Sequence, residues 1–218
     1  MSQEPAIFES LRKSAVIAVL VIDSVDSAEP LASALLQGGV DAMELTLRTP
    51  VALDALRVIR ERVPDMLAGI GTILTPDQVQ QVIDAGGSFG VSPGMTPRVV
   101  EAAIAAGLPF APGVATPSDI ERALEYDRTL LKFFPAGPSG GLPYLESIAA
   151  PYQHLGLRYV PLGGVSEANC DEYLKNPLIS AVGGSWLAPR NLINDGNWQA
   201  ITDRARAAIA IRDTIRSQ

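Results

Sequence analysis

The chain has 218 residues, of which 47% are hydrophobic and 19% charged, a composition typical of a globular protein with its own core. Its net charge is −7 and no block of Lys or Arg occurs, so neither nucleic acid nor an anionic membrane is an expected partner. The first apolar run, residues 15–22, follows a polar start (residues 1–5) and is too short to span a bilayer, so we expect a cytoplasmic protein.

Eight short aliphatic runs predict β-strands, and each is followed by a turn and a helical pattern. The runs are Val16–Ile22, Ala42–Leu47, Met66–Ile70, Phe89–Val91, Pro109–Pro112, Leu130–Phe134, Arg158–Val160 and Ala181–Val182. Strands that alternate with helices form parallel sheets, and eight such units can close into a barrel. We therefore predict an α/β fold, a single compact TIM (β/α)8 barrel over residues 1–218. A doubly wound open sheet is the alternative.

Helix starts are predicted from Thr-Pro, which occurs four times, always after a predicted strand. Threonine can cap the first turn, and proline suits the first helical position. The four threonines are Thr49, Thr75, Thr96 and Thr116. We also predict an N-terminal cap helix over Ala6–Lys13 and a final helix over Trp198–Arg216.

The second predicted strand places Glu44 and Arg48 on one face, because alternate residues of a strand share a face. A buried glutamate is costly unless it is paired or protonated. Glu44 is therefore either half of an ion pair, with Arg48 or Lys132, or a carboxyl group that relays protons.

Lys132 is one of three lysines in a chain with fourteen arginines, and its neighbours Leu130, Leu131, Phe133 and Phe134 are apolar. Burial disfavours an ammonium ion and favours a free amine, which attacks carbonyl groups. Lys132 is a candidate Schiff-base nucleophile. The alternative is a packed lysine whose ammonium reaches solvent or an acid.

Glycines and hydroxyl residues follow several other strands. Thr72 follows the third strand and could bind a carboxylate or serve only as a turn hydroxyl, while Pro93 follows the fourth. Gly163-Gly164 and Gly183-Gly184-Ser185 end the last two strands, where backbone amides of such barrels bind phosphate. Tight turns also use glycine pairs, but two pairs at these positions favour a phosphorylated ligand.

Histidine and cysteine chemistry has few candidates. The only histidine, His154, has no carboxylate or histidine at ligand spacing, and the only cysteine is Cys170. We expect no catalytic histidine triad, no disulfide, no metal and no cofactor.

Six segments together resemble the 2-dehydro-3-deoxy-phosphogluconate aldolases, which include the 4-hydroxy-2-oxoglutarate aldolases. The segments, in order between Val16 and Pro189, are Glu44-Leu45-Thr46-Leu47-Arg48, Gly71-Thr72, Ser92-Pro93-Gly94, Lys132-Phe133-Phe134-Pro135-Ala136, Gly163-Gly164 and Gly183-Gly184-Ser185-Trp186. The first and fourth segments together are highly specific.

The resemblance implies a class I aldolase that cleaves a phosphorylated keto acid, works without a metal and forms a homotrimer. It implies that Lys132 forms the imine and that Glu44 relays protons. The residues implied to bind substrate are Arg48 and Thr72 at the carboxylate, Pro93 and Phe134 along the site, and Gly163, Gly164, Gly184 and Ser185 at the phosphate.

One departure bears on substrate choice. Leu162 stands where the family usually has threonine, so recognition of the C4 hydroxyl of the substrate is in doubt, and the galactonate epimer or 4-hydroxy-2-oxoglutarate are further candidate substrates. Ala18 in place of proline, and a loop 137–141 without an acid, are departures that need not touch the chemistry. The rival functions are a phosphosugar isomerase or epimerase and a non-catalytic barrel that binds a phosphorylated metabolite.

Overall fold

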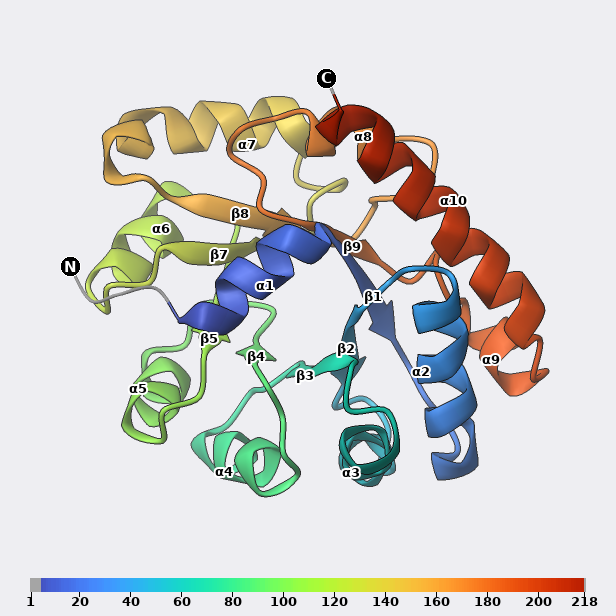
Figure 1. The fold of residues 1–218 in the computed structure, drawn as a ribbon. Helices are drawn as coiled ribbons and strands as arrows, with labels where there is room; N and C mark the ends of the chain where they lie inside the picture. Colours follow the sequence, from blue (N-terminus) through green and yellow to red (C-terminus); the bar gives the residue numbers. More distant parts are fainter. Residues whose placement is uncertain (1–4, 218) are drawn as a thin grey trace.

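The computed structural model describes residues 5–217, so residues 1–4 of the polar start and residue 218 lie outside the described part. Within it, nine strand segments and ten α-helices alternate along the chain (Figure 1). The strands are β1 (Val16–Leu20), β2 (Ala42–Thr46), β3 (Leu67–Gly71), β4 (Gly90–Val91), β5 (Phe110–Ala111), β6 (Gly113–Val114), β7 (Leu130–Phe133), β8 (Arg158–Pro161) and β9 (Val182–Gly184). The predicted strands all occur, with boundaries that differ by one or two residues.

The helices lie outside the strands, as the α/β pattern predicts, except for α1, which lies across one end of the barrel (Figure 1). They are α1 (Ala6–Ser14), α2 (Ala28–Gln37), α3 (Ala52–Arg62), α4 (Pro76–Asp84), α5 (Pro97–Ala105), α6 (Pro117–Leu124), α7 (Gly141–Ala149), α8 (Cys170–Leu174), α9 (Arg190–Asn194) and α10 (Trp198–Arg216), with 3-10 turns η1 (Val25–Ser27) and η2 (Ala150–Leu155). Among the described helices, none has both the length and the apolar character needed to cross a bilayer.

The strands are parallel and form one curled sheet in two pieces. Six strands run in the order β5-β4-β3-β2-β1-β9, and three run in the order β6-β7-β8. Pro112 separates β5 from β6, because proline has no N–H to continue the ladder. The predicted fifth strand, Pro109–Pro112, is therefore present as β5, and β6 is a further short strand that the sequence did not predict.

The two pieces meet at both edges. At Pro112, the carbonyl oxygen accepts a hydrogen bond of 2.9 Å from the N–H of Lys132. At the other edge, the backbone N–H of Tyr159 in β8 donates to the Leu178 carbonyl oxygen over 2.8 Å. The Tyr159 carbonyl oxygen accepts from Ser180 N–H over 2.9 Å, just before β9 begins. The sheet therefore closes into a TIM-type barrel.

Two hydrophobic clusters follow from the alternation of side chains along the strands. The larger lies between the strands and the outer helices, and it includes Met43 and Leu45 of β2. The smaller fills the barrel, and it includes Ala42 of the same strand. This is the arrangement that the parity of the second strand predicts, and it leaves Glu44 on the inner face.

The N-terminal helix closes one end of the barrel. In α1, Phe8 and Leu11 are buried and belong to the inner cluster. Arg212 and Arg216 of α10 donate to the carbonyl groups of residues 12–14 at the end of α1, where such groups lack helical partners. The cap helix predicted over Ala6–Lys13 is thus confirmed, and the opposite end of the barrel stays open.

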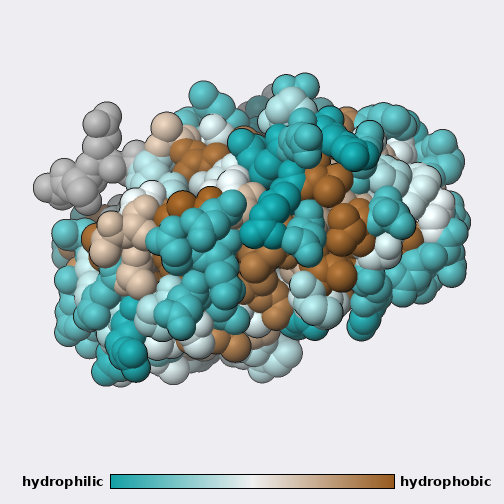
Figure 2. Space-filling view, turned by 90° about the horizontal axis from the view of Figure 1, so that it is seen from below, coloured by the Kyte–Doolittle hydropathy of each residue, from teal (hydrophilic) through white to brown (hydrophobic). Residues whose placement is uncertain are grey.

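The outer surface mixes polar and apolar residues. The face shown in Figure 2 is mostly hydrophilic, with a group of hydrophobic residues near its middle. Of the large hydrophobic side chains that the structure describes, Leu74, Ile104 and Leu155 are exposed. Scattered exposure of this kind is ordinary for a globular protein.

The Thr-Pro pairs start three helices as predicted, but not the fourth. Thr75 and Thr116 each form a capping box at the start of α4 and α6, and Thr96 precedes α5 without a side-chain bond. The prediction for Thr49 is wrong, since Val51 is the N-cap of α3. The hydroxyl of Thr49 instead donates to the carbonyl oxygen of Ile22 over 2.7 Å.

We expect Thr116→Ala to lower the free energy of unfolding by about 1 kcal/mol, because the variant loses the bond that its side chain accepts from Asp119 N–H. Thr96→Ala is the matched control, since Thr96 also precedes a proline but accepts no such bond. Urea denaturation of both variants measures the difference. Equal losses in the two variants would contradict the assignment of the cap.

Candidate active site

The open end of the barrel holds a cavity of about 250 Å³. All ten residues predicted for the site line it, together with four others. The lining residues are Val19, Glu44, Thr46, Arg48, Thr72, Pro93, Lys132, Phe134, Leu162, Gly163, Gly164, Val165, Gly184 and Ser185. They come from the ends of the strands and the loops that follow, which is where barrels of this type carry their sites.

Lys132 and Glu44 form an ion pair at the bottom of this cavity. Lys132 Nζ lies 3.1 Å from Glu44 Oε1, and the residues are 6% and 2% exposed. They are the only charged residues among the buried ones that the structure describes. Nζ also lies 5.4 Å from the centre of the Phe134 ring, within range of a cation–π interaction. Of the two partners considered for Glu44, the structure selects Lys132.

The pair lies where the polar cavity meets the apolar interior of the barrel. Apart from Glu44 and Lys132, every residue around the small cavity beneath them is hydrophobic, including Phe8 and Leu11 of the cap helix. Water therefore reaches the pair from the open end. A charge in such a place depends strongly on its partner, because the apolar side offers no hydration.

Gly71 of β3 makes room for the carboxylate. A Cβ atom at this position would lie 1.7 Å from Glu44 Oε1, which is far inside contact distance. Thr72, the next residue, has a left-handed backbone with φ of 64°. A β-branched residue rarely adopts this conformation, and such backbone strain is often found at functional sites.

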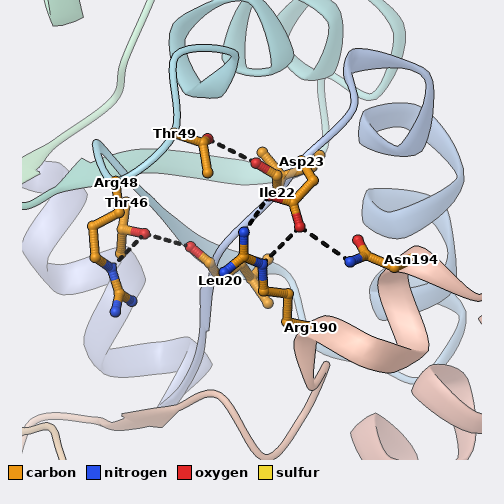
Figure 3. Close-up of polar contacts among 8 residues, drawn as sticks. All are labelled: Leu20, Ile22, Asp23, Thr46, Arg48, Thr49, Arg190 and Asn194. Atoms are coloured by element: carbon orange, nitrogen blue, oxygen red, sulfur yellow. Dashed lines mark hydrogen bonds and ion pairs between the residues drawn. The ribbon is translucent and has the colours of Figure 1, made fainter.

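Arg48 lies at the exposed rim of the cavity, beyond the end of β2. Its Nε donates to Thr46 Oγ1 over 3.1 Å, as Figure 3 shows. Among the described residues it forms no ion pair, so a Glu44–Arg48 pair does not occur. The remaining guanidinium N–H groups are available to an anion in the cavity.

Backbone amides gather at a second part of the cavity, after β8 and β9. Gly163 and Gly164 have φ of 81° and 93°, values that favour glycine over other residues. Within residues 5–217, neither amide donates to another backbone group. Gly184 and the exposed Ser185 line the same part. Unoccupied amides beside a hydroxyl form a suitable site for a phosphate group.

The other candidate groups lie away from the cavity. His154 is exposed in η2. Cys170 is buried in the outer cluster, where burial raises the pKa of its thiol and disfavours the reactive thiolate. Among residues 5–217, no group of three or more His, Cys, Asp or Glu side chains is placed to hold a metal ion.

Sequence reasoning passed over three lining residues: Val19, Thr46 and Val165. Strand parity could have indicated Thr46, which shares the inner face of β2 with Glu44. Val19 also alternates with Ile17, a residue of the inner cluster. Val165 follows the glycine pair in a loop, where no periodic pattern applies.

The geometry is suited to chemistry on a carbonyl compound that carries negative charge at both ends. A lysine amine and a carboxylate are within hydrogen-bond distance of each other at the centre. The rim arginine and the free amides line the same cavity. Proton transfer from the ammonium to Glu44 would leave a nucleophilic amine at the bottom of the site.

The comparisons with known proteins agree with this geometry. The model of the KDPG and KHG aldolase family matches residues 7–204. The 2-dehydro-3-deoxy-phosphogluconate aldolase of Treponema pallidum (strain Nichols) is 42% identical over 205 residues, which are 94% of this chain and 97% of the relative. The KHG/KDPG aldolase of Escherichia coli (strain K12) is 40% identical over 89% of this chain and 90% of its own.

A solved structure is equally similar. The KDPG aldolase of Legionella pneumophila, with pyruvate captured at low pH as a covalent carbinolamine intermediate, superposes with a TM-score of 0.88. It is 39% identical, and the match covers 95% of this chain and 98% of that one. The family match spans most of the chain and includes every residue around the cavity. The chain belongs to the KDPG and KHG aldolase family.

Proposed function

We propose that this protein is a class I aldolase that cleaves 2-dehydro-3-deoxy-6-phosphogluconate to pyruvate and D-glyceraldehyde 3-phosphate. The observation that carries the proposal is the buried contact of 3.1 Å between Lys132 Nζ and Glu44 Oε1 at the bottom of an open cavity. This contact gives the amine a proton acceptor at the place where a ketone would meet it.

The first half of the reaction forms an imine. Lys132 transfers a proton to Glu44, and its neutral amine adds to the C2 carbonyl group to form a carbinolamine. Glu44 then returns a proton to the C2 hydroxyl group, water leaves, and a protonated imine remains. The positive charge on the imine makes C2 an electron sink for the next step.

The second half breaks the C3–C4 bond. Glu44, again a carboxylate after the dehydration, takes the C4 hydroxyl proton through water, and the oxygen forms the aldehyde carbonyl. The electrons of the C3–C4 bond form a C2–C3 double bond, and the C–N π electrons move to nitrogen, which gives a neutral enamine. The aldehyde departs, C3 takes a proton, and water hydrolyses the new imine to pyruvate and free Lys132. Every step uses groups of the chain, the substrate or water.

The two charged ends of the substrate have separate binding groups in this proposal. Arg48 and Thr72 bind the carboxylate next to C2, with Pro93 and Phe134 along the wall. The phosphate is bound by the residues Gly163, Gly164, Gly184 and Ser185 of the same cavity. The pyruvate adduct captured in the Legionella relative supports an aldolase reaction that yields pyruvate, and the dual name of the Escherichia coli relative supports 4-hydroxy-2-oxoglutarate as a further substrate.

Assembly and location are also part of the proposal. We expect a homotrimer in the cytoplasm, as the family resemblance implies. A molar mass from light scattering three times that of the 23.0 kDa chain would support the trimer, and a mass of one chain would refute it.

Lys132→Arg should abolish both cleavage and the trapping of pyruvate by borohydride, because a guanidinium stays protonated and cannot add to a ketone. Intact mass measures the adduct, and a peptide map locates it. Lys175→Arg, on the surface, is the matched control and should be trapped like the wild type.

An adduct on Lys13 or Lys175, or turnover retained in Lys132→Arg, would remove the Schiff-base assignment. A wild type that binds the phosphorylated substrate but forms no adduct would favour an isomerase, an epimerase or a non-catalytic barrel. Those rivals keep the phosphate site without a covalent step.

Glu44→Gln should slow imine formation and cleavage on the order of 10²–10⁴-fold, the range typical of a lost general acid–base group. The amide keeps the shape of the side chain, so it still fits against Gly71. Borohydride added at successive times after mixing with substrate gives the rate of imine formation, and thermal unfolding gives the stability of the variant. If stability fell by several kcal/mol while turnover per folded molecule stayed near wild type, Glu44 would be only a structural partner.

Leu162→Thr should sharpen the preference for the gluconate epimer over the galactonate epimer. Leu162 is 4% exposed and lines the cavity, and it has no polar group to bind the C4 hydroxyl of either epimer. A hydroxyl that pairs with one epimer should change the ratio of the two kcat/KM values by about 1–3 kcal/mol, which is roughly 5- to 150-fold.

Leu162→Val is the matched control for this prediction, since valine has the shape of threonine without the hydroxyl. A wild type that already selects gluconate strongly, with no change in Leu162→Thr, would show that this position does not read C4. An equal rise in the preference for the gluconate epimer in Leu162→Val and Leu162→Thr would assign the effect to the size of the side chain alone.

A further inference from the structure

We infer that Thr46 is a positioning residue, which fixes the guanidinium of Arg48 so that the two Nη groups face the carboxylate of the bound keto acid. The inference rests on the proposed function, because it takes the ligand at this rim to be a carboxylate. It assigns to Thr46 a role in binding, although its hydroxyl is directed at protein groups.

A chain of two hydrogen bonds supports this role. Thr46 Oγ1 donates to the carbonyl oxygen of Leu20 over 2.9 Å, across from β2 to the end of β1. The same oxygen accepts from Arg48 Nε over 3.1 Å. Figure 3 shows the three groups in line, with Thr46 between the other two.

The direction of each bond is fixed by chemistry. A hydroxyl has one proton, and the Leu20 carbonyl can only accept it. The lone pairs of Thr46 Oγ1 are then directed to other donors, and Arg48 Nε can only donate. Thr46 is 3% exposed, so water has little access to compete for these partners.

Few contacts other than the bond to Thr46 restrain the side chain of Arg48. It lies past the end of β2, in a tight turn in which its N–H donates to the Thr46 carbonyl oxygen over 2.7 Å. It is exposed, and within the described part of the chain its side chain has no bonding partner other than Thr46. A free arginine samples many rotamers, and a fixed guanidinium plane loses fewer of them on binding.

Occupation of Nε by Thr46 also selects how Arg48 can bind an anion. A guanidinium can present either its Nε–Nη edge or its two Nη groups to a carboxylate. The Thr46 bond blocks the first edge and leaves the second free. The two Nη groups match the two oxygens of one carboxylate, so loss of the bond should weaken binding of that group specifically.

Thr46→Val tests the inference, because valine keeps the shape and removes both bonds. The concentration of pyruvate that gives half-maximal borohydride trapping at Lys132 should rise about 10-fold, as expected for loss of an orienting hydrogen bond. Thr46→Ser restores the hydroxyl and should return the value to near wild type. Intact mass gives the trapped fraction, and thermal unfolding confirms that each variant is folded.

Thr49→Val is the matched control. Thr49 also donates to a carbonyl oxygen of the loop after β1, that of Ile22, but it has no bond to Arg48 (Figure 3). Its half-saturating pyruvate concentration should stay within about twofold of wild type, because the lost hydroxyl has no bond to Arg48.

A ketone without a carboxylate separates positioning from general damage. Trapping of hydroxyacetone at high concentration should be the same in wild type and Thr46→Val, because neither enzyme can use Arg48 for this ligand. In the Arg48→Gln background, Thr46→Val should produce no further loss with pyruvate, since the partner through which Thr46 acts is gone.

Three results would overturn the inference while leaving the proposed function intact: trapping of pyruvate that is unchanged in Thr46→Val, an equal loss with both ketones, or full additivity with Arg48→Gln. A wild type in which pyruvate forms no adduct at Lys132 would instead refute the proposed function, and the role of Thr46 with it.

Discussion

Two oppositely charged groups, Lys132 Nζ and Glu44 Oε1, lie 3.1 Å apart next to the hydrophobic interior of a closed barrel, and the rest of the site is arranged around them. Each is stable as an ion mainly because the other is present, since removal of one partner leaves a charge that neither water nor the hydrophobic interior can solvate. The cap helix contributes by closing the far end of the barrel with Phe8 and Leu11. The fold therefore excludes water from the capped end of the barrel and leaves the ion pair accessible to a ligand from the open end.

Backbone shape sets the two sides of the cavity. Gly71 allows the Glu44 carboxylate to lie against β3, where a Cβ atom would exclude it. Across the barrel, the left-handed backbone of Gly163 and Gly164 leaves their amides without backbone partners among the described residues. The rim arginine and these amides are thus two separate anion sites in the cavity that contains the lysine. A substrate with a charge at each end fits two such sites.

The sequence predicts the barrel and the inward placement of Glu44 and Lys132, because these follow from short local patterns, but it leaves Arg48 and Lys132 open as partners of Glu44. Alternation in β2 places Glu44 inside, and the apolar neighbours of Lys132 indicate a buried strand. Other features depend on contacts between distant segments, which no local pattern encodes. Thr49 has a Thr-Pro helix signal, yet its hydroxyl binds the Ile22 carbonyl instead. Thr46 has the parity of a site residue, but its link to Arg48 depends on the carbonyl of Leu20 in another strand.

The most direct test of the central claim is the exchange of the methyl protons of pyruvate with deuterated water, followed by NMR. Exchange at C3 requires both an imine at Lys132 and a group that carries protons, so it tests the two halves of the pair together. The account predicts rapid exchange with the wild type and exchange at the uncatalysed rate with a folded Lys132→Arg variant. Exchange at the same rate in both proteins, or none in the wild type, would contradict it.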